Sequence, residues 1–257
     1  MLEIWDCNML SLGGGGGDDY IFFLDSDDFL ALETMEMMIN TSNRYDYPDI
    51  VRCGIARYDE KGNFLQNYTS RQIGINKEYN GVNGLDYLAK IPPMYFSPST
   101  SSLINIDLLK KNNIVFDEGL INEDLPFAFK IYIKAKKVCF DESSFYGYRA
   151  RYGSTSCAET FSNHGTELLF KSYKNNCDFL LSLFTNNNYK KIQKLISYNL
   201  RECAQLPILC WIQDRTICKK EELKPLFPFM TIKVKIAYFF PFIARIAIKI
   251  RQWRIND

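Results

Sequence analysis

The sequence predicts an α/β fold, in which helices flank a mixed β-sheet, followed by a helical appendage. The apolar run at residues 20–24 is typical of a strand buried on both faces. Short apolar runs then alternate with helix-like segments as far as about residue 140, as they do in an α/β sheet. From about Thr160 onward the apolar residues recur only at helical spacing. At 257 residues, 47% of them hydrophobic, the chain is long enough for one such domain with an appendage.

Each element of the predicted sheet domain has its own local signal. Leu32, Met35, Met38 and Ile39 have helical spacing and predict a helix directly after the first strand. The turn sequence at 59–63 predicts a hairpin between its two apolar neighbours, and the prolines at 92 and 93 end the next helix. The predicted elements are a helix at 31–42, strands at 50–58 and 64–68, a helix at 83–91, a strand at 103–104, helices at 107–112 and 127–135, and a strand at 138–140.

Composition excludes several classes of function. Thirty-one basic against 30 acidic residues give a net charge of +1, so no overall field attracts nucleic acid, and no nucleic-acid partner is expected. The eight cysteines include no C-x-x-C pair and the chain has one histidine, which argues against a zinc site. The first residues lack the apolar core of a secretory signal, so we expect reduced thiols and a cytoplasmic protein.

An acidic cluster follows the first predicted strand directly. Asp25, Asp27 and Asp28 stand where ligands bind in open α/β sheets, at the carboxyl end of a strand. Asp25 and Asp27 have the spacing of an Asp-x-Asp motif and are able to share one Mg²⁺ or Mn²⁺, because such ions take one or two carboxylates together with phosphate oxygens. The alternative is that Asp27 or Asp28 only caps the following helix.

A second acidic pair, Glu123 and Asp124, precedes another predicted helix, with Pro126 near its first turn. Capping is again the alternative, since proline and acidic residues favour the first turn of a helix. Two acidic pairs at helix starts in one α/β domain, however, suit a metal site and a group that removes a proton.

Three motifs together resemble a family-2 glycosyltransferase of the GT-A fold. They are the sequence from Tyr20 to Asp28, the sequence Asn122-Glu-Asp-Leu-Pro-Phe, and the sequence from Tyr146 to Ser156. The resemblance covers roughly residues 18–156. It implies inverting transfer of a sugar from a nucleotide-diphosphate donor to an acceptor hydroxyl, in the synthesis of a surface polysaccharide or a lipid-linked glycan.

The resemblance also implies roles for individual residues. Asp25 and Asp27 would hold the metal ion against the donor diphosphate, with Asp28 supporting them. Asp124 would be the catalytic base, and Glu123 would orient it or the acceptor. Arg149 and Ser154 would lie on a loop that closes over the donor.

The chain departs from the family pattern at its start. The family carries a strand–helix–strand portion, which holds the nucleotide base, ahead of the Asp-x-Asp strand, whereas here a five-glycine run, residues 13–17, precedes that strand. We therefore expect an N-terminally truncated GT-A-like sheet with an unpaired edge. The alternative function is a catalytically impaired relative that acts as a membrane-associated interaction module.

The C-terminal segment combines basic and aromatic residues. Its longest uncharged stretch, 236–244, is far shorter than the roughly twenty residues of a membrane span. Such a segment suits an anionic membrane surface on the inner face of the membrane, while a helix packed on the protein's own core is the alternative. The predicted organisation is a flexible glycine-rich start at 1–17, a catalytic portion at 18–157, a helical appendage at 158–223 and a membrane-surface segment at 224–257.

Overall fold

The computed structural model describes residues 7–13, 19–67, 78–90, 100–150 and 165–244 of the chain. The chain divides into two compact units. Met1–Asp117 and Asp124–Thr160 form one, here called the sheet unit, while Glu118–Glu123 and Phe161–Asp257 form the other, the helical unit.

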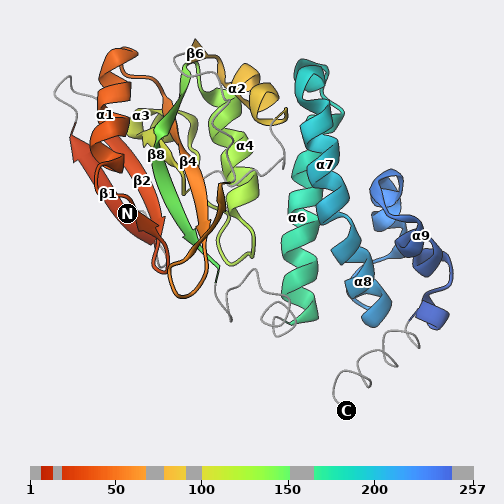
Figure 1. The fold of residues 1–257 in the computed structure, drawn as a ribbon. Coiled ribbons are helices and arrows are strands. Elements are labelled where there is room, and N and C mark those ends of the chain that lie inside the picture. The colour runs from red at the N-terminus through yellow and green to blue at the C-terminus, as the bar shows by residue number, and fades with distance from the viewer. Residues whose placement is uncertain (1–6, 14–18, 68–77, 91–99, 151–164, 245–257) are drawn as a thin grey trace. The chain divides into compact units, whose positions relative to one another are not determined.

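The sheet unit contains a mixed sheet with the strand order β1-β2-β7-β4-β8-β3, to which β5 adds beside β4 and β6 beside β8 (Figure 1). β7 runs antiparallel to both β2 and β4, and β4 runs parallel to β8, so β2, β4 and β8 all point the same way. The predicted mixed α/β sheet is therefore confirmed. The strands are β1 Cys7–Gly13, β2 Asp19–Asp25, β3 Phe29–Leu30, β4 Ile50–Tyr58, β5 Phe64–Asn67, β6 Glu78–Tyr79, β7 Ser102–Asn105 and β8 Val138–Arg149.

Strand β1 corrects one prediction about the start of the chain. The sequence predicted a flexible segment at 1–17, but Cys7–Gly13 pairs antiparallel with β2 along its whole length and becomes the edge strand of the described sheet. The pairing satisfies the backbone N–H and C=O groups that β2 presents on that side, which supplies the physical reason for the strand.

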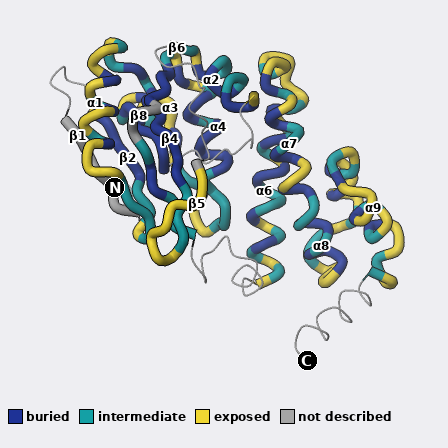
Figure 2. Tube along the Cα trace, viewed as in Figure 1, coloured by how far each residue is buried: buried dark blue, intermediate teal, exposed yellow. Residues whose placement is uncertain are grey.

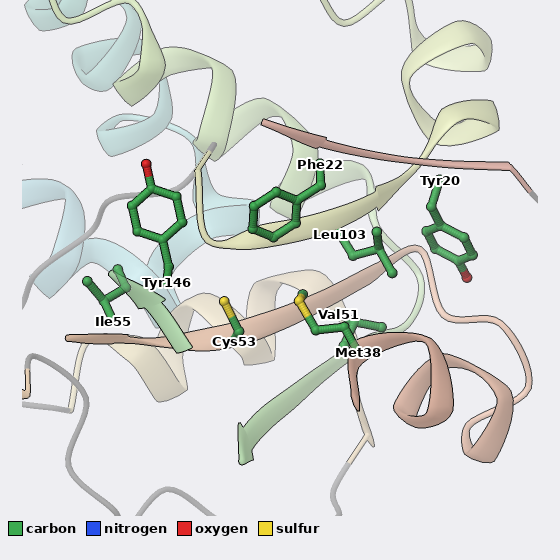
Figure 3. Packing of buried hydrophobic residues seen from close by; sticks show 8 residues of the cluster. All are labelled: Tyr20, Phe22, Met38, Val51, Cys53, Ile55, Leu103 and Tyr146. Atoms are coloured by element: carbon green, nitrogen blue, oxygen red, sulfur yellow. The ribbon is translucent and has the colours of Figure 1, made fainter. Parts of the chain in front are cut away.

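Helices cover both faces of the sheet. On one face α1, Thr34–Arg44, contacts β4 and β8, and its Met38 joins a cluster with alternate residues of the strands (Figure 3). On the other face α2, Gly81–Leu88, α3, Ile106–Asn112, and α4, Asp124–Lys134, pack together. The central strands are consequently buried on both sides, as the continuous apolar run of β2 predicted (Figure 2).

The contact between α2 and α4 depends on a glycine. A Cβ at Gly81 would lie 1.6 Å from the backbone oxygen of Tyr132 in α4, so no larger residue fits there. This close approach fixes α2 against the C-terminal half of α4.

The helical unit begins with a short segment taken from the middle of the chain. The Ile121 N–H donates to Ser172 Oγ at 2.9 Å, and Asn176 Nδ2 donates to the Asn122 carbonyl at 3.0 Å. None of the helices in the described ranges has both the length and the apolar character needed to cross a bilayer. The helices are α6 Thr166–Phe184, η1 Asn187–Ile192, α7 Gln193–Cys203, α8 Gln205–Gln213, η2 Lys220–Phe229 and α9 Ile232–Phe239.

Candidate functional site

The acidic cluster lies at the edge of the sheet where the parallel strands end. β2 ends at Asp25 and β8 ends at Arg149, and both strands point toward this edge. The chain turns directly after Asp25, because the Asp28 N–H donates to the Asp25 carbonyl at 3.1 Å. Phe29 and Leu30 then form β3, which pairs with β8. The cluster therefore stands where ligands bind in open α/β sheets.

Asp28 connects this turn to the end of β8. The Tyr146 hydroxyl donates to Asp28 Oδ2 at 2.5 Å, and the Arg149 N–H donates to Asp28 Oδ1 at 2.8 Å. The Asp25 N–H in turn donates to the Tyr146 hydroxyl oxygen at 3.3 Å. Because both oxygens of Asp28 accept bonds from β8, the carboxylate holds the Asp25–Asp28 turn in place.

Burial raises the pKa of both Asp28 and Tyr146. Loss of hydration raises the pKa of Asp28 to about 6, and the charges of Asp25 and Asp27 add to the rise, while the bonds from Arg149 and Tyr146 oppose it. Burial also raises the pKa of the Tyr146 hydroxyl, with the charges of Asp25 and Asp28 contributing. Tyr146 is thus a hydrogen-bond donor throughout the physiological range.

The structure answers the capping alternative for this cluster. α1 begins only at Thr34 and its N-cap residue is Glu33, so neither Asp27 nor Asp28 caps that helix. The turn and the short strand β3 separate the acidic residues from α1.

The start of α4 lies on the same face of the sheet as Asp25. The ring of Phe127, in the first turn of α4, lies edge-on 5.8 Å from the ring of Phe23 in β2. Asp25 follows Phe23 by two residues along the strand, and Asp124 precedes Phe127 by three along the helix, so each shares a face with its phenylalanine. The Phe23–Phe127 contact therefore brings the face carrying Asp25 and the face carrying Asp124 together.

Asp124 and its neighbour Glu123 belong to different parts of the fold. Asp124 is the first residue of α4, whereas Glu123 ends the segment that groups with the helical unit. Asn122, just before them, has a φ of 61°, a left-handed conformation that asparagine tolerates. A carboxylate in the first turn of a helix also interacts favourably with the helix dipole, so the capping alternative for Asp124 agrees with the structure as well.

Arg149 and Ser154 were expected near the donor. The Arg149 guanidinium carbon lies 5.7 Å from the centre of the Phe29 ring, and its Nε makes no hydrogen bond to the described residues. This side chain is half-buried at the carboxyl end of β8. Ser154 lies outside the described residues, and so does the loop predicted to close over the donor.

The residues expected to hold a divalent cation are Asp25 and Asp27. In the described part of the chain, no three His, Cys, Asp or Glu side chains form a group arranged to hold a metal ion. A cation that also binds a diphosphate requires only one or two protein carboxylates. Asp28 bonds to β8 through both oxygens, and the turn that it holds carries the carboxylates of Asp25 and Asp27.

Sequence reasoning missed the role of Tyr146. The residue lies within one of the quoted motifs, but nothing in the order of residues shows that its hydroxyl bonds to Asp28, 118 positions away. The pairing of β3 with β8, in which Phe29 is the register partner of Gly147, brings the two side chains together.

A mixed sheet with an acidic turn at the carboxyl end of its first long parallel strand and helices on both faces is the GT-A-like fold. The solved structures agree with this fold. The chain is similar to S. aureus TarS 1–349 in complex with UDP-GlcNAc, with a TM-score of 0.53 and 16% identity over 88% of this chain and 64% of that one. The same TarS fragment in a second structure gives a TM-score of 0.50 and 14% identity over 88% and 63% of the two chains.

This likeness confirms the predicted GT-A-like fold class. The chain spans less than two thirds of the length of these TarS fragments. Comparison of the sequence with protein-family models and with curated proteins finds no match.

Proposed function

We propose that this protein is an inverting glycosyltransferase that moves a sugar from a nucleotide-diphosphate donor to an acceptor hydroxyl. The observation that carries the proposal is the Phe23–Phe127 contact, since it brings the acidic turn after β2 and the acidic start of α4 to one face of a GT-A-like sheet. A donor site and a base on the same face are what such a reaction requires.

The residues divide the reaction between them. The carboxylate of Asp124 accepts the proton of the acceptor hydroxyl as the hydroxyl oxygen attacks the anomeric carbon of the donor sugar. The bond from that carbon to the diphosphate oxygen breaks, and its electron pair leaves with the nucleotide diphosphate. Attack from the side opposite to the leaving group inverts the anomeric centre. Glu123 orients Asp124 or the acceptor, and Arg149 with Ser154 bind the donor.

Asp25 and Asp27 would hold Mg²⁺ or Mn²⁺ at the donor diphosphate, where the bound cation stabilises the negative charge that develops on the leaving group. Asp28 contributes by fixing the turn that carries both residues, through its bonds to Tyr146 and Arg149. UDP-GlcNAc is the first donor to try, because it is the ligand in the similar TarS structure.

The acceptor we propose is a surface polysaccharide or lipid-linked glycan at the inner face of the membrane, and α9 supports this placement. Val234 and Tyr238 are its buried side, and the Tyr238 ring lies 5.9 Å from that of Trp211 in α8. The opposite side is apolar and more than half exposed, as Figure 2 shows for the helix as a whole. The exposed residues at helical spacing in and just after α9 are Ile232, Ile236, Phe239, Phe240 and Ile243.

Positive charges flank this exposed side. Lys233 is exposed within α9, and Lys220 Nζ lies 5.8 Å from the centre of the ring of Phe239, one of the exposed residues. An apolar face bordered by lysines suits the headgroup region of an anionic bilayer. We therefore propose that α9 attaches the helical unit to the membrane surface.

A transfer assay tests the reaction. Release of UDP from UDP-GlcNAc in the presence of Mn²⁺ is measured for the wild type, for Asp124→Asn and for the control Asp107→Asn, an exposed acid at the start of α3. Loss of the base should lower kcat by about 10²–10⁴-fold, while the control should match the wild type. Nuclear magnetic resonance of the product should show the anomer opposite to that of the donor.

Equal rates for Asp124→Asn and the wild type would contradict the assignment of the base. A folded chain that turns over no donor would instead favour the non-catalytic alternative, a membrane-associated interaction module.

A further inference from the structure

Arg52, the third residue of β4, is a buried charge, and two of its three guanidinium nitrogens have no hydrogen-bond partner among the described residues. Its side chain is 2% exposed, and neither Nε nor Nη1 makes a hydrogen bond to any described residue. Moving a guanidinium out of water is costly unless an acceptor replaces the lost hydration. An anion bound at this position would offset the cost of burying the Arg52 guanidinium.

The neighbouring strand, β7, supplies a second buried polar group that has no hydrogen-bond partner among the described residues. Ser102 of β7 is the register partner of Arg52, and its buried hydroxyl also has no hydrogen-bond partner among the described residues. Registered residues of an antiparallel pair point to the same face. The Arg52 Nε and Nη1 and the Ser102 hydroxyl, none of them bonded to a described residue, match the two oxygens of a carboxylate or phosphate group.

The alternation of side chains along β4 shows on which face of the sheet Arg52 lies. Val51 and Cys53, on either side of Arg52, belong to the cluster that packs against α1 (Figure 3). Arg52 therefore points to the opposite face, where its other register partner, Phe140, packs against Tyr87 of α2. This is also the face on which Phe23 meets Phe127.

Arg52 lies close to the candidate site on that face. Only β7 separates β4 from β2, and the register places Val51 and Leu103 level with Phe22, so Arg52 and Ser102 are level with Phe23. Asp25 follows two residues further along β2. From strand spacings, the Cα atoms of Arg52 and Asp25 are about 12 Å apart.

We propose that Arg52 and Ser102 form a subsite for an anionic group, a carboxylate or a phosphate, carried by the acceptor. This inference rests on the proposed transferase function for its acceptor, but the anion binding itself does not require transfer. Asp25 and Asp27 are assigned to the donor diphosphate. We therefore assign the separate site of Arg52 and Ser102 to the acceptor.

The first arm of the test measures anion binding without donor. Thermal unfolding of the full chain is followed in inorganic phosphate and in acetate, at fixed ionic strength with chloride as the reference. At ten times the dissociation constant, the wild type should unfold about 3–6 °C higher than in chloride. Arg52→Met should lose this shift, and its unfolding temperature in chloride should equal or exceed that of the wild type, because a buried charge has been removed.

Two further variants serve as a control for removal of a surface arginine and as a substitute if Arg52→Met does not fold. Arg44→Gln, which removes an exposed arginine of α1, should retain the full shift. If Arg52→Met does not fold, Ser102→Ala tests the same subsite, since removal of an unpartnered hydroxyl should preserve the fold but reduce the shift. No anion-specific shift in the wild type, or an undiminished shift in Arg52→Met or Ser102→Ala, would overturn the proposal.

The second arm identifies the source of the anion. Transfer to glycerol 3-phosphate is compared with transfer to glycerol, and transfer to glucuronate with transfer to glucose. The wild type should prefer the anionic member of each pair, and Arg52→Met should raise KM for that member alone. Equal KM values within each pair would overturn the assignment to the acceptor and leave a site for free anions. Absence of all transfer would instead count against the transferase, and the thermal shift would still decide whether the anion site exists.

Discussion

The bond network of Asp28 predicts a specific pH dependence of stability. Burial raises the pKa of Asp28 in the folded protein to about 6, above the ordinary value of 3.8 that applies when the chain is unfolded. Between these values the folded protein binds more protons than the unfolded chain, so its stability falls as the pH rises from about 4 to about 6. Asp28→Asn removes this titration while keeping an oxygen that accepts the Arg149 N–H bond.

The size of the effect follows from the shift. About two pKa units correspond to about 3 kcal/mol, and because the carboxyl is only partly buried, solvent screening reduces this to about 1–2 kcal/mol. We therefore expect the free energy of unfolding of the wild type to decrease by about 1–2 kcal/mol relative to Asp28→Asn between pH 4 and pH 7.

Urea unfolding of both proteins at several pH values between 4 and 7 provides the measurement. Using the difference between the two proteins cancels the titration of all other groups. Asp28→Ala serves as a second comparison, because it leaves Tyr146 O–H and Arg149 N–H without their acceptor and should destabilise the protein at pH 4 by about 2–4 kcal/mol. Parallel pH profiles for the wild type and Asp28→Asn would show that burial does not raise the pKa of Asp28 in the folded protein.

Two further predictions concern α4 and α9. Phe127→Ala should destabilise the sheet unit by about 3–5 kcal/mol in urea unfolding, because it removes the ring that packs on Phe23. The control Phe64→Ala, at an exposed position, should cost less than about 1 kcal/mol. Similar losses of stability in the two variants would contradict the packing of Phe127 on Phe23. Ile236→Asp should abolish co-flotation with vesicles of phosphatidylglycerol and phosphatidylcholine, while Leu32→Asp, an exposed apolar position of the sheet unit, should leave it unchanged. Flotation retained in Ile236→Asp, or self-association of the wild type lost in that variant, would assign the face of α9 to something other than lipid.

Local sequence patterns predicted most of the elements because their signals are local. The apolar run of β2, the helical spacing in α1 and the hairpin of β4 with β5 each depend on neighbouring residues. The acidic residues at the strand end followed from the same reasoning, since β2 was the only element needed to place Asp25.

What the sequence did not predict depends on long-range pairing. β1 was missed because its partner lies beyond a glycine run that carries no structural signal of its own. The bond from Tyr146 to Asp28 follows from the pairing of β3 with β8, and the buried position of Arg52 follows from the register of β4 against β7 and β8. Arginine in a strand usually indicates a solvated position, so only the fold shows that this one is enclosed.

Donor binding decides whether the acidic turn after β2 is a nucleotide-sugar site. Calorimetry of the purified chain with UDP-GlcNAc and other nucleotide sugars is performed with and without Mn²⁺ for the wild type, Asp27→Asn and the control Asp19→Asn, an exposed acid at the opposite end of β2. We predict Mn²⁺-dependent binding that is retained in Asp19→Asn and weakened at least tenfold in Asp27→Asn. Folded protein that binds no nucleotide sugar, or binds one equally well in Asp27→Asn, would contradict the assignment of this site.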